Sequence, residues 1–368
     1  MKRKMLNLIA GLAALTWLLS VGLADSERHE PIIPELSATP TQSPSTVPAN
    51  GDVNPYGVAF VPHGFPAGGP LKPGDIIVSN FNDIGNTQGK GTTIVSISPS
   101  GQLSLFFQGP PPPGHGLTTA LGVLKRGFVL VGSLPTTDGK CGTIGKIGQT
   151  SLLMLDRNGS QIMTLTDSKL LDGPWDLTIH DQGQFAQVFV SNVLSGTVTR
   201  IDLRVPQHGN PVVQSMTQIA SGYHHDCNAA AVVVGPTGLA YDAARDILYV
   251  ASTDDNEIFA VPHARKTARD EGTGLLVYRD DEHLHGPLGL TLAPNGDLIT
   301  ANGDAVFGDP TQPSELVEFT PEGQFVGQFS VDPAQGAAFG LALHFKGNTG
   351  TFAAVDDATN VLDIWTLE

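Results

Sequence analysis

One short phrase recurs six times along the 368-residue chain and limits its folding more than any other feature. Most copies combine a proline or alanine, a bulky residue and a glycine with a short alternating apolar segment. The copies begin at Pro55, Ala120, Pro174, Pro236, Pro287 and Ala338, between 51 and 65 residues apart. Repeats of this period are typical of solenoids, propellers and tandem arrays.

Each phrase reads as the start of a short strand, and two or three more alternating segments follow it before the next copy. After the first copy these segments are residues 75–80, 93–98 and 103–107. Turn sequences such as Pro294-Asn295-Gly296 separate them. Four short strands per unit, repeated six times, predict an all-β, six-bladed β-propeller with four-stranded blades over residues 52–368. The 43 Gly and 27 Pro suit so many turns and argue against a coiled coil or helical bundle.

The blade heads and the last unit add two expectations about the ring. Glycine is expected at the head of the innermost strand because six backbones converge at the central channel. The last unit ends at Glu368 after its third strand, so its outer strand is missing. A segment within residues 30–52 is the candidate to supply that strand and close the ring.

The N-terminus reads as an export leader followed by a linker. Lys2, Arg3 and Lys4 precede an apolar stretch over residues 6–23, and Gly22-Leu23-Ala24 is a small-x-small cleavage pattern. Residues 1–24 are therefore interpreted as a signal peptide, with an uncleaved membrane anchor as the alternative. The Pro-, Ser- and Thr-rich residues 25–51 are interpreted as a linker. A secreted or periplasmic location follows.

The chain is acidic, with 20 Lys and Arg against 36 Asp and Glu and a net charge of −16. This balance argues against nucleic acid and anionic membrane surfaces as partners, and it leaves cations as the natural charged partners. We expect a monomer.

Insertions are expected to gather on one face of the propeller, because loops between second and third strands and loops between blades emerge on the same side. They are residues 81–92, 134–150, 303–314, 108–118, 221–235 and 279–286. This side is called the loop-rich face below. Long insertions on one face of a repeat protein usually mark its binding surface. Cys141 and Cys227 both fall on this face and are predicted to form a disulfide, with two free thiols as the alternative.

Polar residues end the second strands and are expected to ring the channel mouth. They are Asn80, Ser133, Asn192, Ser252, Asn302 and Asp356, and Asp254, Asp255 and Asp357 lie next to them. Such a ring could hold a hydroxylated ligand or a cation. The alternative is structural, since Asn, Ser and Asp at strand ends often cap backbone groups in turns.

A second candidate site combines histidine and carboxylate residues near blades four and five. Its residues are His224, His225, Asp254, His283 and His285. Imidazole and carboxylate groups from neighbouring loops could hold Zn²⁺ or a similar divalent ion, and Ca²⁺ is the other candidate. No spacing here matches an established metal motif, so solvated loop histidines are the alternative.

Two segments carry a resemblance to a known superfamily. Gly238-Leu239-Ala240-Tyr241-Asp242 with the following residues 247–252, and Leu290–Leu298, resemble the NHL-repeat and SMP-30/gluconolactonase-like propellers over roughly residues 52–368. The resemblance implies the same architecture, and it covers enzymes and binding scaffolds alike.

The catalytic residues implied by this resemblance are mostly absent. The metal-binding Glu of the lactonases has no counterpart at the first blade head, Thr237 stands in place of their Asn, and only Asp254 matches. NHL-like lyases place His just before the blade-head glycine. The corresponding positions here are Tyr56, Leu121, Trp175, Thr237, Leu288 and Phe339.

Two functions of different class are therefore carried forward. The first is an exported binding scaffold for a protein, glycan or small ligand on the loop-rich face. The alternative is a metal-dependent hydrolase or lyase that uses the His/Asp residues near blades four and five.

Overall fold

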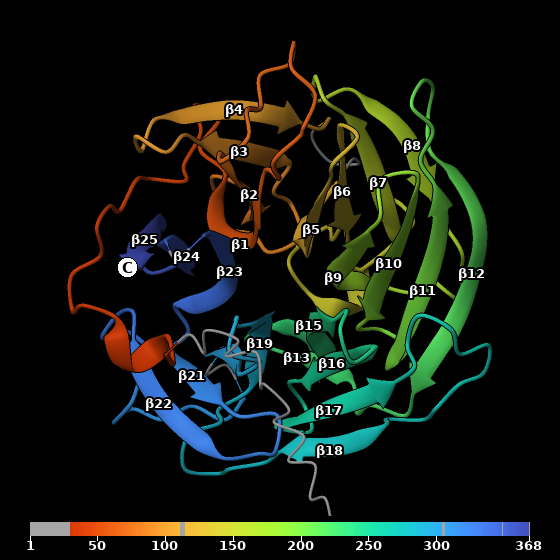
Figure 1. The fold of residues 1–368 in the computed structure, drawn as a ribbon. Coiled ribbons are helices and arrows are strands. Elements are labelled where there is room, and N and C mark those ends of the chain that lie inside the picture. Colours follow the sequence, from red (N-terminus) through yellow and green to blue (C-terminus); the bar gives the residue numbers. More distant parts are fainter. Residues whose placement is uncertain (1–29, 111–114, 304–305, 348, 368) are drawn as a thin grey trace, which may run out of the picture.

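The computed structural model describes residues 30–110, 115–303, 306–347 and 349–367, which form a ring of antiparallel sheets around a channel (Figure 1). The predicted all-β, six-bladed propeller is confirmed. Two short 3₁₀ turns, η1 (Ile33–Glu35) and η2 (Cys141–Thr143), are the helical elements of these residues. None of the described residues forms a helix long and apolar enough to span a membrane. The predicted signal peptide, residues 1–24, lies outside them.

Five blades have four hydrogen-bonded strands each, which follow chain order from the channel outward. Blade one contains β1 (Val53–Phe60), β2 (Ile76–Asn82), β3 (Thr93–Ile97) and β4 (Leu103–Gln108), and blade two contains β5 (Leu117–Leu124), β6 (Phe128–Ser133), β7 (Ser151–Asp156) and β8 (Gln161–Leu165). Blade three contains β9 (Pro174–Asp181), β10 (Phe185–Asn192), β11 (Thr197–Arg204) and β12 (Val212–Ser221). Blade four contains β15 (Pro236–Asp242), β16 (Ile247–Ser252), β17 (Glu257–Pro262) and β18 (Leu275–Tyr278), and blade five contains β19 (Pro287–Leu292), β20 (Leu298–Asn302), β21 (Glu315–Phe319) and β22 (Phe325–Ser330).

The sixth blade is completed by the N-terminal segment. Its own strands are β23 (Ala338–Lys346), β24 (Thr349–Asp356) and β25 (Val361–Leu367). Antiparallel bridges join Gln42 to Ile364 and Ser45 to Val361, so residues 41–46 take the outer position. Figure 1 shows this red-to-orange segment running outside β25 before it enters β1. The edge of β25 is thereby paired rather than exposed.

A buried carboxylate anchors the start of this segment to blade five. Both oxygens of Glu318 accept backbone N–H groups, from Ile32 at 3.0 Å and from Ile33 at 2.7 Å. Glu318 is wholly buried, and Ile32 and Ile33 pack into the apolar core between blades five and six. Burial raises the pKa of Glu318, while the two backbone N–H groups oppose that shift.

The inner strands of neighbouring blades approach each other closely at the channel. A Cβ on Gly57 would lie 2.6 Å from the carbonyl oxygen of Thr119, and one on Gly340 would overlap the Tyr56 carbonyl oxygen. Both approaches are closer than real Cβ contacts allow, so the expected reason for glycine at the blade head is confirmed there.

Two blade heads depart from the repeated phrase. In blade two, Leu117 pairs with Ser133 and Leu121 with Val131, so the true head precedes the phrase read from the sequence. Gly122 lies further along the strand, where a Cβ would meet Leu177 and Ile179 side chains. β5 advances four residues between these two pairings, where β1 and β15 advance three, and its first pairing lies three residues before the start of the repeated phrase at Ala120. In blade three, Asp176 occupies the glycine position.

Burial follows the order of the strands in each sheet. All residues of β2, β6 and β20 are buried, because these second strands lie between two others and between neighbouring blades. Outer strands such as β18 and β22 consist mostly of exposed and half-buried residues. The long apolar runs of the second strands and the weaker pattern of the fourth strands have this common cause.

We expect Glu318→Gln to loosen the N-terminal segment. One of the two backbone N–H groups would then face an amide NH₂ instead of a carboxylate oxygen. The expected loss is about 1–3 kcal/mol of unfolding free energy, measured by denaturant unfolding, together with faster proteolysis within residues 30–52. Glu322→Gln, in an exposed turn, is the matched control. Equal stability and equal proteolysis of both variants would refute the anchoring role.

Candidate functional site

A pocket of about 360 Å³ opens at the loop-rich end of the channel. Blade heads form its floor, and loops from four parts of the chain form its walls. Its lining consists of Asn54, Tyr56, Gln88, Trp175, Ala230, Ala231, Val233, Val234, Thr253, Leu288, Gly303, Gln335, Gly336, Phe339 and Asp357. It is called the channel-mouth pocket below.

An aromatic cluster fills the channel beneath this pocket. Tyr56 stacks on Phe339 with ring centroids 4.5 Å apart, and its centroid lies 5.8 Å from that of Trp175 in an edge-on contact. Phe81 packs against both Tyr56 and Trp175. Tyr56 also lines the hollow at the opposite end of the channel, so the cluster separates two cavities.

The pocket combines apolar side chains with several polar ones. Asn54 donates from Nδ2 to Asp357 Oδ2 at 3.1 Å, and its backbone N–H donates to Asn360 Oδ1 at 2.8 Å. Asn54 Oδ1 and Trp175 Nε1 are both buried and have no hydrogen-bond partner among the described residues. A buried polar atom without a partner destabilises a fold by about 1–3 kcal/mol. Both residues line the channel-mouth pocket, so an acceptor atom and a donor atom without a partner among the described residues lie close to one pocket.

Asp357 is the ionisable group of this pocket. Burial, and next the carboxylate of Asp356, raise its pKa to about 7. The nearby Asp357 carboxylate in turn adds to the effect of burial in raising the pKa of Tyr56, which stays a neutral phenol. Near neutral pH the pocket therefore contains a carboxyl group that is protonated in part of the molecules.

A short hairpin forms one wall of the pocket. It comprises β13 (Asp226–Asn228) and β14 (Val232–Val234) in the connection between blades three and four. Val232 is buried with a φ of 63°, a left-handed conformation that a β-branched residue rarely adopts. Gln88 donates from Nε2 to the Ala230 carbonyl oxygen at 2.9 Å and so ties the hairpin to a loop of blade one. Backbone strain of this kind clusters at functional sites.

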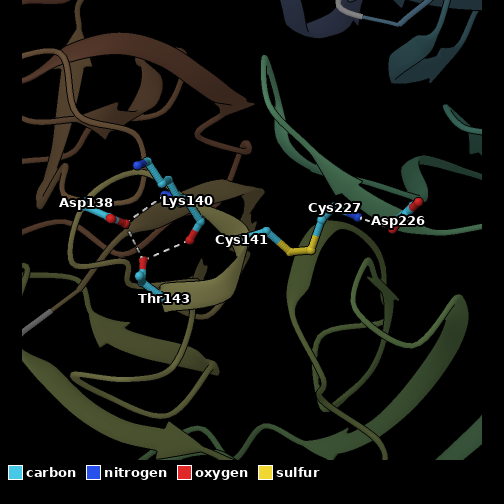
Figure 2. Close-up of a disulfide and its surroundings, with 6 residues drawn as sticks. All are labelled: Asp138, Lys140, Cys141, Thr143, Asp226 and Cys227. Carbon is cyan, nitrogen blue, oxygen red and sulfur yellow. Dashed lines mark hydrogen bonds between the residues drawn. A yellow bond between two sulfur atoms is a disulfide. The ribbon is translucent and has the colours of Figure 1, made fainter.

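The predicted disulfide between Cys141 and Cys227 is confirmed (Figure 2). It joins η2, in a loop of blade two, to the hairpin, with the Cα atoms 5.5 Å apart and a sequence separation of 86. The η2 loop has its own hydrogen bonds, among them one from Thr143 Oγ1 to Asp138 Oδ1 at 2.8 Å. The disulfide therefore connects an ordered loop to the pocket wall.

None of the six polar strand-end residues lines this pocket, and five of them have structural hydrogen-bond partners. All six are buried within the blades. Three equivalent amides, Asn80, Asn192 and Asn302, donate to the carbonyl oxygens of Thr46, Leu170 and His283, each in the segment that enters the same blade. Ser252 donates to Asp255 and Asp356 accepts from Thr359. Ser133 likewise lies at the buried end of β6. As a ligand-binding ring these residues stay a prediction, and the structural alternative accounts for the contacts above.

The five residues of the predicted His/Asp metal site do not form one cluster in the structure. His224 faces Asp255, with 3.3 Å from Nδ1 to Oδ1, and His225 Nδ1 lies 3.1 Å from the Tyr223 carbonyl oxygen. Asp254 has a raised pKa through burial and the adjacent Asp255. His283 and His285 belong to two separate clusters, with Asp280 and Glu282 and with Asp309 and Glu315. His283 and His285, two residues apart in the connection between blades four and five, thus contact different partners.

The opposite end of the channel contains a second hollow of about 480 Å³, lined by the inner strands. Asp176 lies there in the glycine position of blade three. Its carboxylate accepts the backbone N–H groups of Leu177 at 2.7 Å and Leu239 at 3.2 Å, which joins blades three and four. Burial raises its pKa strongly, against the lowering effect of these N–H groups. This carboxylate is a structural bridge between two inner strands.

Five of the fifteen pocket residues were named from the sequence, each in another context. Tyr56, Trp175, Leu288 and Phe339 were singled out only as positions without histidine, and Asp357 only as a neighbour of the strand ends. One sequence feature could have identified four of them: Tyr56, Trp175, Leu288 and Phe339 are bulky residues at the same position of the repeated phrase. Equivalent positions of the inner strands lie close together at the channel axis, so these side chains could be expected to meet there. The hairpin had no comparable signal, since residues 221–235 read as an irregular loop.

Comparisons with known proteins give the fold. No protein-family model matches the chain, and the search of curated proteins found no match. A gluconolactonase from Xanthomonas campestris matches with a TM-score of 0.54 at 14% identity, over 92% of this chain and 93% of its own. A putative oxidoreductase (glucose dehydrogenase) from Thermus thermophilus matches with a TM-score of 0.51 at 12% identity, over 88% and 99%.

The chain has the fold of the SMP-30/gluconolactonase-like propellers, as the sequence resemblance implied. A chain of the mitotic checkpoint complex also matches, with a TM-score of 0.53 at 11% identity over 96% of this chain and 99% of its own. A similar fold thus occurs in an enzyme and in a multiprotein assembly. Fold similarity alone does not choose between catalysis and binding.

We expect Asp357→Asn to remove a pH dependence of stability. The folded protein binds the Asp357 proton more tightly than the unfolded chain, in which the pKa is near 3.8. This group therefore stabilises the fold below about pH 4, and the stabilisation is lost as the pH rises to about 7. The unfolding free energy of wild type minus that of Asp357→Asn should fall by up to a few kcal/mol over this range. Denaturant unfolding at several pH values measures it, and parallel pH curves for the two proteins would contradict the assignment.

Replacement of both cysteines by serine should destabilise the protein and loosen the pocket wall. The expected loss of unfolding free energy is about 2–4 kcal/mol, because the bond closes a long loop in the unfolded chain. Denaturant unfolding under non-reducing conditions gives the difference, and hydrogen exchange should rise most in residues 226–234. Reducing agent should bring the wild type to the stability of the double variant and leave that variant unchanged. A double variant as stable as oxidised wild type would refute the role.

Proposed function

We propose that the chain is a binding protein for a small molecule, which it takes up in the channel-mouth pocket. The observation that carries the proposal is the pair of buried polar atoms, Asn54 Oδ1 and Trp175 Nε1, that lack a partner among the described residues and belong to two residues of a pocket with a mixed apolar and polar lining. Binding pockets typically combine an apolar lining with a few convergent polar groups. The volume of about 360 Å³ falls at the lower end of the range for such pockets.

The chemistry of the lining defines the class of ligand. Tyr56, Trp175, Leu288 and Phe339 offer apolar and aromatic surface, which suits a compact ring or branched hydrocarbon body. Asp357 and Asn54 suit a hydroxyl or amine on that body, since both side chains offer acceptor oxygens. A protein or a glycan, the wider classes considered from the sequence, would need an open surface rather than a recess at the channel mouth.

The alternative function, a metal-dependent hydrolase or lyase, has less support. Such a reaction needs the ion beside the substrate. Within the described part of the chain, the groups of His and acidic residues that could hold an ion are Asp280, Glu282 and His283 and, separately, His285, Asp309 and Glu315. None of these six lines the channel-mouth pocket. We therefore favour binding without catalysis.

We also propose that the protein is exported. The leader-like sequence of residues 1–24, which lies outside the described residues, supports this location. The disulfide between Cys141 and Cys227 adds support, because such bonds persist in oxidising compartments.

A ligand screen with a filled-pocket variant tests the proposed function. Small aromatic and alicyclic alcohols, acids and amines are added to the wild type and to Ala231→Trp, whose indole would occupy the pocket. A ligand at 100 times its Kd stabilises the fold by about 2.7 kcal/mol, which a thermal shift detects. We expect shifts with wild type and none with Ala231→Trp.

Ala268→Trp, on an exposed loop of the opposite face, is the matched control and should respond as wild type does. Asp357→Asn should weaken the binding of amines more than that of alcohols. Equal shifts with wild type and Ala231→Trp, or no shift across the panel, would reject the pocket as a binding site.

A further inference from the structure

Three side chains that can bind a metal ion meet on the loop-rich side of blade five. None of them lines the channel-mouth pocket. His285 ends the connection into blade five, Glu315 begins β21, and Asp309 lies in the 303–314 loop between β20 and β21. One nitrogen or oxygen atom from each lies within 4.8 Å of the others. Three separate segments thus contribute one potential metal ligand each.

The cluster is built into the blade rather than scattered on the surface. Glu315 is fully buried, and His285 is only 8% exposed. His285 Nδ1 lies 3.5 Å from Glu315 Oε1 and, although buried, has no hydrogen-bond partner within the described parts of the chain. An imidazole nitrogen left in this state is costly unless another group satisfies it.

The spacing of these atoms fits a metal ion between them. Two ligands of a tetrahedral ion, each about 2.1 Å from it, lie roughly 3.4 Å apart, close to the 3.5 Å between His285 Nδ1 and Glu315 Oε1. Asn302 donates from Nδ2 to Glu315 Oε2 at 3.4 Å and orients the carboxylate from behind. Partners of this kind commonly support metal ligands.

The donor set also selects the kind of ion. One imidazole nitrogen with two carboxylates suits Zn²⁺ and related transition metals. Ca²⁺ prefers six to eight oxygen ligands, so a histidine-containing set of three does not suit it.

We propose that His285, Asp309 and Glu315 bind one divalent transition-metal ion, for which Zn²⁺ is the natural candidate. Three protein ligands leave one tetrahedral position for water. The ion would link Asp309 to His285 and Glu315 and so fasten the loop around Asp309 to blade five. Gly303, at the start of that loop, lines the channel-mouth pocket, so the ion would steady one wall of it. The proposal does not rest on the proposed small-molecule function.

The neighbouring cluster of Asp280, Glu282 and His283 provides a matched control. His283 Nδ1 is already hydrogen-bonded to Asp280 Oδ2 at 2.6 Å, and its ring stacks on Phe325 at 3.8 Å between centroids. Its nitrogen is thus satisfied without an ion. Each cluster contains one Asp, one Glu and one His, and the two histidines are two positions apart in sequence. The effects of the two histidine substitutions can therefore be compared directly.

Zinc titration of the chelator-treated, full-length protein tests the site. Calorimetry should give one Zn²⁺ per chain, and Zn²⁺ should raise the melting temperature. His285→Gln and Asp309→Asn should each weaken zinc binding at least tenfold and remove the thermal shift. His283→Gln should bind zinc as wild type does. Asp309 lies on a partly exposed loop, so its variant should fold even if the buried positions tolerate no change.

Three results would overturn the proposal. The first is the absence of stoichiometric zinc binding by wild type. The second is unchanged affinity in Asp309→Asn and His285→Gln, with folding of each variant checked by circular dichroism. The third is loss of binding in His283→Gln, which would assign the ion to the neighbouring cluster.

Discussion

The structure depends on the close approach of neighbouring inner strands around the channel. Backbone atoms of one blade head fill the space that a side chain would take on the next, most tightly where Gly340 meets the Tyr56 carbonyl oxygen. That contact joins the last blade to the first. With the backbones this close, Tyr56, Leu288 and Phe339, which precede blade-head glycines, converge at the channel mouth together with Trp175 of blade three. The aromatic cluster and the pocket above it follow from this constraint.

The ring holds this geometry because its ends are fastened together. Residues 41–46 pair with β25, and the carboxylate of Glu318 holds Ile32 and Ile33 against blade five. The first and last parts of the described chain thus share one blade. The inner strands can pack tightly because the outer edge cannot open, and the side chains at the channel mouth are positioned by contacts far from them.

The sequence predicted the architecture because the constraint leaves a local signature. Glycine, alternating apolar residues and hairpin turns recur with each blade, and the disulfide pairing followed from the sorting of loops by face. Blade two did not follow this pattern, since its inner strand has a larger bulge than those of the other blades and Gly122 lies beyond the blade head. Blade three departs from the glycine pattern in another way. Asp176 stands at the glycine position, where its carboxylate accepts hydrogen bonds from the backbone N–H groups of Leu177 and Leu239.

The candidate site was harder to predict, because its parts come from loops without periodicity. Residues in one loop, such as His283 and His285, go to different partners, and their sequence proximity was misleading as a guide to a shared site. The strand-end amides of Asn80, Asn192 and Asn302 are buried and donate hydrogen bonds to the segments that enter their blades. A sequence pattern does not show this burial. The hairpin at 226–234 depends on a disulfide and on the unusual backbone of Val232, neither of which a strand pattern reveals.

The aromatic cluster also has a kinetic consequence. Tyr56 borders both cavities, and its contacts with Phe339 and Trp175 place three bulky rings between the two ends of the channel. The rim of the channel-mouth pocket is therefore the more direct way in and out for a bound molecule. Its residence time would then depend on movements of the rim at residues 230–234 and 335–336, and the disulfide that restrains one side of this rim would slow entry and escape together.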